Sequence, residues 1–214
     1  MEKITRNILI GLGAITGGGL IAVITNAYSN TRKIGKRSNV LFIGDSITAG
    51  NFSYADQLAK LIPSLNVKKI AKGGMRTDWM LDNAKADLQS GNYDAVFILG
   101  GINDAYSQVS ISGIEKNLQA MYDLGRRNGA KVYALTVVPS ENYVSYNNFY
   151  GTRAEALNSW IRGNKSVTKV IDYNKLLKTN GKQNTALFAP DALHPNTKGH
   201  TVLAEYINKN VFKG

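Results

Sequence analysis

The stretch LFIGDSITAG, residues 41–50, changes abruptly from apolar to polar. The apolar run Val40–Ile43 is typical of a strand buried on both faces, and it stops at Gly44, Asp45 and Ser46. Gly, Asp and Ser all form turns readily, so a plain turn explains the break. An active-site serine explains it equally well, and the rest of the chain has to decide between the two.

Apolar strand patterns and amphipathic helix patterns alternate from this stretch to the end of the chain. We expect strands over 40–43, 67–71, 95–101, 131–139 and 167–173. We expect helices over 54–62, 78–89, 113–129, 152–162 and 197–211. The strands are apolar throughout, which indicates that both faces of the sheet are covered. The pattern therefore predicts a three-layer α/β/α sandwich around a mainly parallel, five-stranded sheet.

Length and composition are those of one globular domain, which we place at residues 40–214. The chain has 214 residues, of which 43% are hydrophobic and 19% charged, enough for a substantial core. It has no cysteine, which excludes disulfides, thiolate nucleophiles and cysteine-based zinc sites. The formal net charge is +11, but no motif gathers the basic residues on one face, so we expect no nucleic-acid partner. An anionic membrane surface or cell-wall polymer suits this charge.

The first 39 residues form a segment of a different kind. Residues 7–31 carry no charge, and basic residues stand on both sides of them. Their apolar centre, ILIGLGAITGGGLIAVI at residues 8–24, is near the lower limit of about 17 residues for a membrane-spanning helix. Three interpretations remain open: a retained membrane anchor, a cleaved export signal, or a glycine-rich arm that packs in a hydrophobic assembly. The first two predict a protein anchored in a membrane or exported to the cell envelope, and the third allows association with a virion.

A second polar stretch, DALHPN at residues 191–196, supplies what an active serine needs. Asp191 stands three residues before His194 and can orient it within one turn. His194 can then take a proton from a hydroxyl, and Ser46 offers one. A serine is a weak nucleophile at its free pKa and requires such a base, itself held by a third group.

Four short blocks of the chain, in this order, resemble those of the GDSL or SGNH hydrolase family. They are GDSI at 44–47, GGMRT at 73–77, GIND at 101–104 and DALHPN at 191–196. The resemblance covers residues 40–212 and implies a flavodoxin-like fold. It also implies a catalytic triad with Ser46 as the nucleophile, His194 as the base and Asp191 as its partner, with no metal and no cofactor.

The same resemblance implies an oxyanion hole formed by Ser46, Gly74 and Asn103. Its donors are the backbone N–H groups of Ser46 and Gly74 and the side-chain amide of Asn103. The second block matches the family loosely, because Gly73 and Gly74 both suit the position, and we prefer Gly74. An oxyanion requires donors that are already in place, and glycine allows a backbone N–H to approach closely.

Other polar residues have simpler interpretations. We expect Asp45 to brace the turn and His200 to pack in the core or lie at the surface. The nucleophile elbow of ordinary α/β-hydrolases requires a glycine at position 48, where this chain has Thr48. The loop at 140–153 contains Tyr143, Tyr146, Phe149 and Tyr150, and either offers aromatic faces to a sugar or is a lid packed for its own sake.

These features together predict a serine esterase that hydrolyses small acyl esters. We expect acetyl groups on a cell-envelope glycan to be the substrate, because no long apolar stretch near the site indicates a fatty-acyl tunnel. A lysophospholipase or thioesterase of the same family is the alternative within enzymes. A non-catalytic binding or structural module, for example a virion component, is the alternative outside them.

Overall fold

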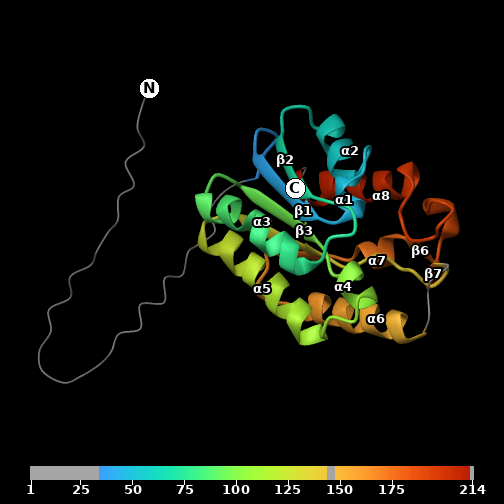
Figure 1. Ribbon diagram of the computed structural model, residues 1–214. Helices are drawn as coiled ribbons and strands as arrows, with labels where there is room; N and C mark the ends of the chain where they lie inside the picture. Colours follow the sequence, from blue (N-terminus) through green and yellow to red (C-terminus); the bar gives the residue numbers. More distant parts are fainter. Residues whose placement is uncertain (1–33, 144–147, 213–214) are drawn as a thin grey trace, which may run out of the picture.

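The computed structural model describes residues 34–143 and 148–212, and these contain a parallel β-sheet of five strands (Figure 1). The strand order is β2-β1-β3-β4-β5, which is that of flavodoxin-like sheets. The predicted fold class is therefore confirmed. The strands are β1 (Asn39–Gly44), β2 (Asn66–Ala71), β3 (Ala95–Leu99), β4 (Lys131–Leu135) and β5 (Lys169–Ile171).

Helices cover both faces of this sheet and produce the three layers seen in Figure 1. One face carries α2 (Tyr54–Leu61) and α8 (Thr197–Ile207), which contact each other. The other face carries a row formed by α3 (Thr77–Ser90), α5 (Ile111–Arg127) and α6 (Asn148–Gly163).

Short elements follow the carboxyl ends of the strands, where open α/β sheets place their sites. The chain turns into α1 after β1, into α4 after β3 and into α7 after β5. A small antiparallel hairpin, β6–β7, then leads through a 3-10 turn toward α8. The bounds are α1 (Ser46–Ala49), α4 (Ile102–Tyr106), α7 (Tyr173–Leu176), β6 (Lys178–Thr179), β7 (Lys182–Gln183), the 3-10 turn (Thr185–Leu187) and a closing π turn (Asn208–Phe212).

Aromatic rings on adjacent strands form the centre of the core under α2 and α8. Phe42 on β1 stacks on Phe97 on β3 at 5.0 Å between ring centroids, and Phe97 stacks on Tyr133 on β4 at 4.6 Å. The parallel register pairs these residues directly. Tyr54 of α2 meets Phe42 edge-on at 5.6 Å. This packing holds the strands rigidly, so the loops at their carboxyl ends start from fixed points.

Two of the long helices, α5 and α8, begin at residues whose side chains satisfy one of their first N–H groups. Ser110 accepts the N–H of Gly113 at the start of α5, and Asn196 accepts that of Gly199 at the start of α8, both at 3.1 Å. These are the side chains preferred at helix N-caps. The predicted helices over 54–62, 78–89 and 113–129 are confirmed within two residues at each end.

Three predicted strands are shorter in the structure. The strand expected over 95–101 ends at Leu99. The strand expected over 131–139 ends at Leu135, because the amide of Asn158 on α6 takes both the N–H (2.8 Å) and the carbonyl oxygen (3.2 Å) of Val137. The strand expected over 167–173 is reduced to β5, because Asp172 caps α7 by accepting the N–H of Lys175 at 3.0 Å.

Helix boundaries also differ near the end of the chain. α6 begins at Asn148, four residues before the predicted 152. α8 keeps α-helical bonding to Ile207 and continues as a π turn through residue 212, where the prediction had one helix over 197–211.

The segment before the domain falls largely outside the described residues. The predicted domain boundary at residue 40 and the apolar centre at 8–24 therefore stay predictions. Within 34–143 and 148–212, none of the helices combines the length and apolarity required to cross a membrane.

Candidate active site

The serine singled out by the sequence is the first residue of α1. Gly44, which ends β1, has no room for a side chain, since a Cβ there would collide with Thr48 and lie 2.9 Å from the carbonyl oxygen of Leu99. Asp45 caps α1 by accepting the N–H of Ile47 at 3.0 Å. The predicted brace by Asp45 is confirmed. The turn thus presents the side chain of Ser46, which is partly exposed, at the carboxyl edge of the sheet.

Three of the predicted side chains form a continuous hydrogen-bonded chain. The Oγ of Ser46 lies 2.8 Å from Nε2 of His194, and Nδ1 of His194 lies 2.6 Å from Oδ2 of Asp191. The other oxygen of Asp191 accepts the N–H groups of Leu193 (2.9 Å) and His194 (3.0 Å). Partial burial raises the pKa of Asp191, but the hydrogen bonds from His194 outweigh it and leave that pKa below its ordinary value. Asp191 therefore stays ionised beside the imidazole.

The turn that carries Asp191 and His194 contains a residue in a strained backbone conformation, and a side chain from β7 holds this turn in place. Ala192 has φ = 57°, a left-handed conformation that is uncommon for residues with a side chain. The buried side chain of Gln183 on β7 donates to the carbonyl oxygen of Ala192 at 2.6 Å. Its own oxygen accepts the backbone N–H of Asn142 at 2.9 Å. Gln183 therefore ties the acid–histidine turn to the loop that follows β4.

Asn103 lies on α4, directly after β3, and its amide reaches across to the glycine block. Its Nδ2 donates to the carbonyl oxygen of Met75 at 2.9 Å. The next residue, Asp104, is 1% exposed and accepts from Thr77 through both the backbone N–H (3.0 and 3.1 Å) and the hydroxyl (2.6 Å). Asn103 and Asp104 thus hold the loop 73–77 against the start of α4.

Gly73 and Gly74 of this loop are both exposed, but a side chain at each position would point in a different direction. A Cβ on Gly73 would lie 3.8 Å from the Cβ of Ser46, whereas a Cβ on Gly74 would meet nothing within 4 Å. Gly74 has φ = 73°, which favours glycine. The loop therefore lies beside Ser46 as predicted, and the role of Gly74 as an oxyanion donor stays a prediction.

Two buried carboxyl groups lie behind Ser46. Asp45 is completely buried, and its Oδ2 has no hydrogen-bond partner among the described residues. Burial raises the pKa of Asp45 to about 6; the N–H of Ile47 and the nearby His194 oppose the rise, and Asp104 adds to it. Burial likewise raises the pKa of Asp104 against the hydrogen bonds from Thr77. Removal from water disfavours the charged form of both groups.

The second histidine of the chain belongs to the core. His200 on α8 is 8% exposed and stacks on Tyr54 with 6.3 Å between ring centroids. Its Nδ1 has no hydrogen-bond partner among the described residues, and burial lowers its pKa to about 4. Of the two interpretations given to His200, packing is confirmed.

Part of the aromatic loop at 140–153, which follows β4, lies within the described residues. Tyr143 and Tyr150 pack against Tyr106 of α4 with ring centroids 5.4 and 5.1 Å apart. The hydroxyl of Tyr106 donates to Oγ of Ser140 at 3.1 Å. These contacts favour packing for the two tyrosines. Tyr146 and the side chain of Phe149 lie outside the described residues.

A family model describes the same segment of chain. The model of the GDSL-like lipase/acylhydrolase family matches residues 42–202. The chain belongs to the GDSL-like lipase/acylhydrolase family. It is accordingly a hydrolase that acts on ester bonds.

Solved structures of other ester hydrolases share the fold at low sequence identity. A GDSL-like lipase from Bacteroides thetaiotaomicron has a TM-score of 0.68 and 18% identity, covering 84% of this chain and 90% of that one. The psychrotrophic esterase EstA from Pseudoalteromonas has a TM-score of 0.64 and 17% identity, covering 81% and 96%. A catalytic mutant of an acetylxylan esterase from Geobacillus stearothermophilus has a TM-score of 0.66 and 21% identity, covering 84% and 96%. No curated protein matches the sequence.

Two residues of this GDSL-family site were missed by the sequence analysis. Thr77 stands at the end of the second block, but no local pattern links it to Asp104, 27 residues away. Gln183 follows an unremarkable polar stretch, and no signal in the sequence marks it as the support of Ala192. Both connections join loops that become neighbours only in the folded chain.

Proposed function

We propose that this hydrolase is a serine esterase that removes small acyl groups, acetyl above all, from a cell-envelope glycan. The observation that carries the proposal is the chain Ser46–His194–Asp191, with contacts of 2.8 and 2.6 Å. A hydroxyl, an imidazole and a carboxylate in this sequence form the arrangement that activates a serine for acyl transfer.

In the proposed reaction, Oγ of Ser46 attacks the ester carbonyl and Nε2 of His194 takes its proton. Asp191 holds the tautomer of His194 that carries a proton on Nδ1, and it stabilises the imidazolium that forms. His194 then donates that proton to the leaving sugar hydroxyl as the ester C–O bond breaks. Water attacks the acyl-serine by the same route in reverse, which releases the acid and restores Ser46.

The negative charge on the carbonyl oxygen requires donors that are in position beforehand. We assign these to the N–H groups of Ser46 and Gly74 and to the amide of Asn103. One N–H of the Asn103 amide donates to the carbonyl oxygen of Met75, which fixes the amide plane. The second N–H has no partner among the described residues and is available to the oxyanion.

A small acyl group suits what surrounds the site. Among the described residues, the large apolar side chains that remain exposed are Phe52 and Leu61, and both belong to α2 and the turn before it. A long fatty chain would require an apolar wall of greater extent. The net charge of +11 favours association with an anionic cell wall. The acetylxylan esterase among the similar structures illustrates that this fold serves deacetylation of a glycan.

We further propose that residues 8–24 hold the protein in the cell envelope. The support is the charge-free stretch 7–31 between basic residues, which is long enough for a short membrane-spanning helix.

A fluorophosphonate probe and p-nitrophenyl acetate test the esterase directly. The probe should label Ser46, and Ser46→Ala should lower kcat by about 10⁴–10⁶ while the protein stays folded. Ser107→Ala, which removes an exposed hydroxyl after α4, is the matched control and should retain activity. Absence of labelling in folded wild-type protein would support a non-catalytic module instead. Faster hydrolysis of long-chain than of acetyl esters would move the assignment to a lysophospholipase or thioesterase.

A further inference from the structure

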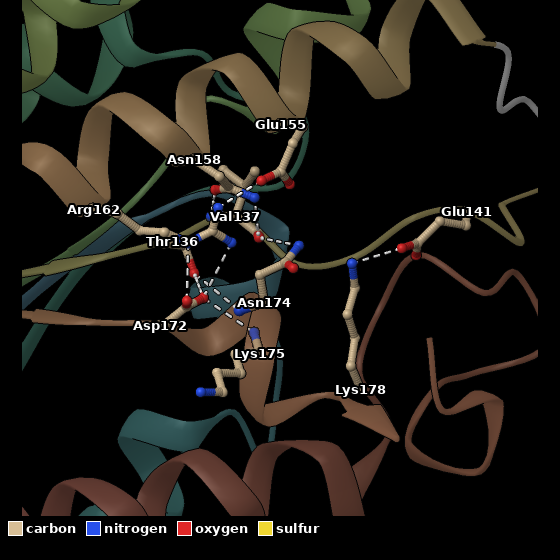
Figure 2. A network of polar contacts seen from close by, with 10 residues as sticks. All are labelled: Thr136, Val137, Glu141, Glu155, Asn158, Arg162, Asp172, Asn174, Lys175 and Lys178. Carbon is tan, nitrogen blue, oxygen red and sulfur yellow. Dashed lines mark hydrogen bonds and ion pairs between the residues drawn. The ribbon is translucent and has the colours of Figure 1, made fainter. Parts of the chain in front are cut away.

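A cleft with charged and amide side chains in its walls lies at the carboxyl ends of β4 and β5, away from Ser46. It runs between α6 on one side and α7 with the β6–β7 hairpin on the other (Figure 2). It consists of two adjoining cavities of about 250 and 470 Å³, which share Glu155, Asn174 and Lys178. We call this feature the α6 cleft.

The bottom of the α6 cleft holds polar side chains that are almost completely buried. Asn158 is 1% exposed, and Ser140 and Asn174 are each 5% exposed. The amide of Asn158 bonds to Val137 through both its oxygen and its nitrogen. Asn174 donates through Nδ2 to the carbonyl oxygen of Val137 at 3.3 Å, but its Oδ1 accepts no hydrogen bond from any described residue. Figure 2 shows this amide between Val137 and Lys178.

Because Asn174 lines both cavities, its Oδ1 is reachable from solvent there and has no donor among the described residues. A ligand hydroxyl that donates to Oδ1 of Asn174 would satisfy it. The hydroxyl of Ser140, which accepts from Tyr106, can itself donate into the same space. The cleft therefore offers one acceptor and one donor at its base.

The charged walls of the cleft neutralise each other. Lys178 pairs with Glu141 at 2.7 Å. Arg162 pairs with Asp172 at 2.9 Å and with Glu155 at 2.5 Å. Together with Lys175, the lining carries three basic and three acidic side chains. A free anion or cation would gain little here, because nearly every charge already has a partner.

What remains is a set of directed hydrogen-bonding groups interspersed with apolar surface. Nζ of Lys178 has donors left after its bond to Glu141, and Glu155 has acceptor positions left after its bond to Arg162. The smaller cavity, at about 250 Å³, lies below the roughly 300–1,000 Å³ of pockets for drug-sized ligands, and the adjoining one, at about 470 Å³, lies within that range. Size, neutrality and alternating donors and acceptors suit one ring of a neutral polyol, which is a sugar unit.

The position of the cleft suits a sugar in a chain with the acylated one. All five strands are parallel, so their carboxyl ends meet at the edge of the sheet that carries Ser46. In the order β2-β1-β3-β4-β5, β4 and β5 lie two and three strands from β1, or about 10 and 14 Å at the usual strand spacing. A sugar bound in the cleft is therefore separated from the acylated unit and must be joined to it through an oligosaccharide.

We propose that the α6 cleft is a subsite for a neutral sugar unit of the glycan whose acyl group is presented to Ser46. This inference rests on the proposed function. It means that the cleft recognises a sugar of the polymer and not the acyl group.

The test compares substrates of different length on the full chain. The probes are an O-acetylated tetramer of β-1,4-linked N-acetylglucosamine, the O-acetylated monomer, and p-nitrophenyl acetate. For the tetramer and for the monomer, the measured quantity is kcat/KM divided by kcat/KM on p-nitrophenyl acetate. In wild-type protein this ratio should be higher for the tetramer than for the monomer.

Two variants and one control locate the effect. Lys178→Met and Asn174→Leu should each lower the tetramer ratio by about 2- to 10-fold, which is the worth of one hydrogen bond. Lys182→Met changes an exposed lysine on the same hairpin that lines neither cavity, and it should keep the wild-type ratio. Because Asn174 is buried, Lys178→Met alone decides the matter if Asn174→Leu fails to fold.

Titration with the unacetylated tetramer gives a second, activity-independent measurement. Its dissociation constant should rise in Lys178→Met and not in Lys182→Met. An equal ratio in all variants, or no binding of the tetramer, would overturn the subsite while hydrolysis of p-nitrophenyl acetate still supported the esterase. Loss of that hydrolysis in the wild type would instead refute the proposed function.

Discussion

Asp45→Asn should stabilise the protein at neutral pH and leave it unchanged in acid. The carboxyl of Asp45 is completely buried, and its Oδ2 has no hydrogen-bond partner among the described residues. Burial raises its pKa from 3.8 to about 6. The folded protein therefore keeps a proton on Asp45 between about pH 4 and 6, where the unfolded chain has lost it. Because the folded state binds more protons, its stability falls as the pH rises through this window.

The magnitude follows from that pKa. A change from 3.8 to about 6, at about 1.4 kcal/mol for each pKa unit, makes ionised Asp45 cost about 3 kcal/mol of folding free energy above pH 6. Asparagine does not ionise, and its oxygen can still accept the N–H of Ile47. The free energy of unfolding of Asp45→Asn relative to wild type should therefore rise by up to about 3 kcal/mol between pH 4 and pH 7.

Urea denaturation at several pH values between 4 and 7 measures this difference. The other carboxyl groups are common to both proteins and cancel in the comparison. Asp78→Asn is the control. The hydrogen bond from Arg76 lowers the pKa of Asp78, so Asp78 titrates below this pH window. The free energy of unfolding of Asp78→Asn relative to wild type should therefore stay constant between pH 4 and 7. If Asp45→Asn also gives a constant difference, Asp45 does not titrate near pH 6 and the argument from burial is wrong.

Three further changes test the site and the segment before it. Asn103→Ala should lower kcat by about 10²–10³ with little change in KM; steady-state kinetics that show a higher KM at unchanged kcat would make Asn103 a substrate-binding residue. Gln183→Leu leaves the N–H of Asn142 and the carbonyl oxygen of Ala192 unpaired, so urea denaturation should show a loss of about 1–3 kcal/mol, with kcat reduced more than KM is raised. Full-length protein should sediment with membranes and resist alkaline carbonate, whereas a chain without residues 1–33 should stay in the supernatant with its esterase activity; a full-length chain that is soluble and monomeric without detergent contradicts the anchor.

The architecture was predictable because its signals are local. Buried strands such as Val40–Ile43 are continuous apolar runs, and the helices show apolar residues at helical spacing between capping and breaking residues. The acid–histidine pair was also readable, because Asp191 and His194 are three residues apart and meet within one turn. Their pairing with Ser46 was an expectation from chemistry that the family resemblance supported, because Ser46 and His194 are 148 positions apart. The structure places Oγ of Ser46 2.8 Å from Nε2 of His194.

The end of β4 and the hydrogen bonds that support the site were not predictable, because they depend on residues that are far apart in the sequence. β4 ends at Leu135 because Asn158, which lies on α6, takes the backbone groups of Val137. Asp104 and Thr77 pair only because β3 and the loop after β2 end at the same edge of the sheet. The same holds for Gln183 and the strained Ala192.

Apolar periodicity, turn residues and the four family blocks are therefore properties of short segments, and they predict the sheet, its layers and the candidate triad without reference to the tertiary structure. Hydrogen bonds between loops depend on which strand ends become neighbours and on how much water the packing removes. For that reason the raised pKa of Asp45, the anchoring of the acid–histidine turn by Gln183 and the α6 cleft with its buried Asn174 became visible only in the packed protein.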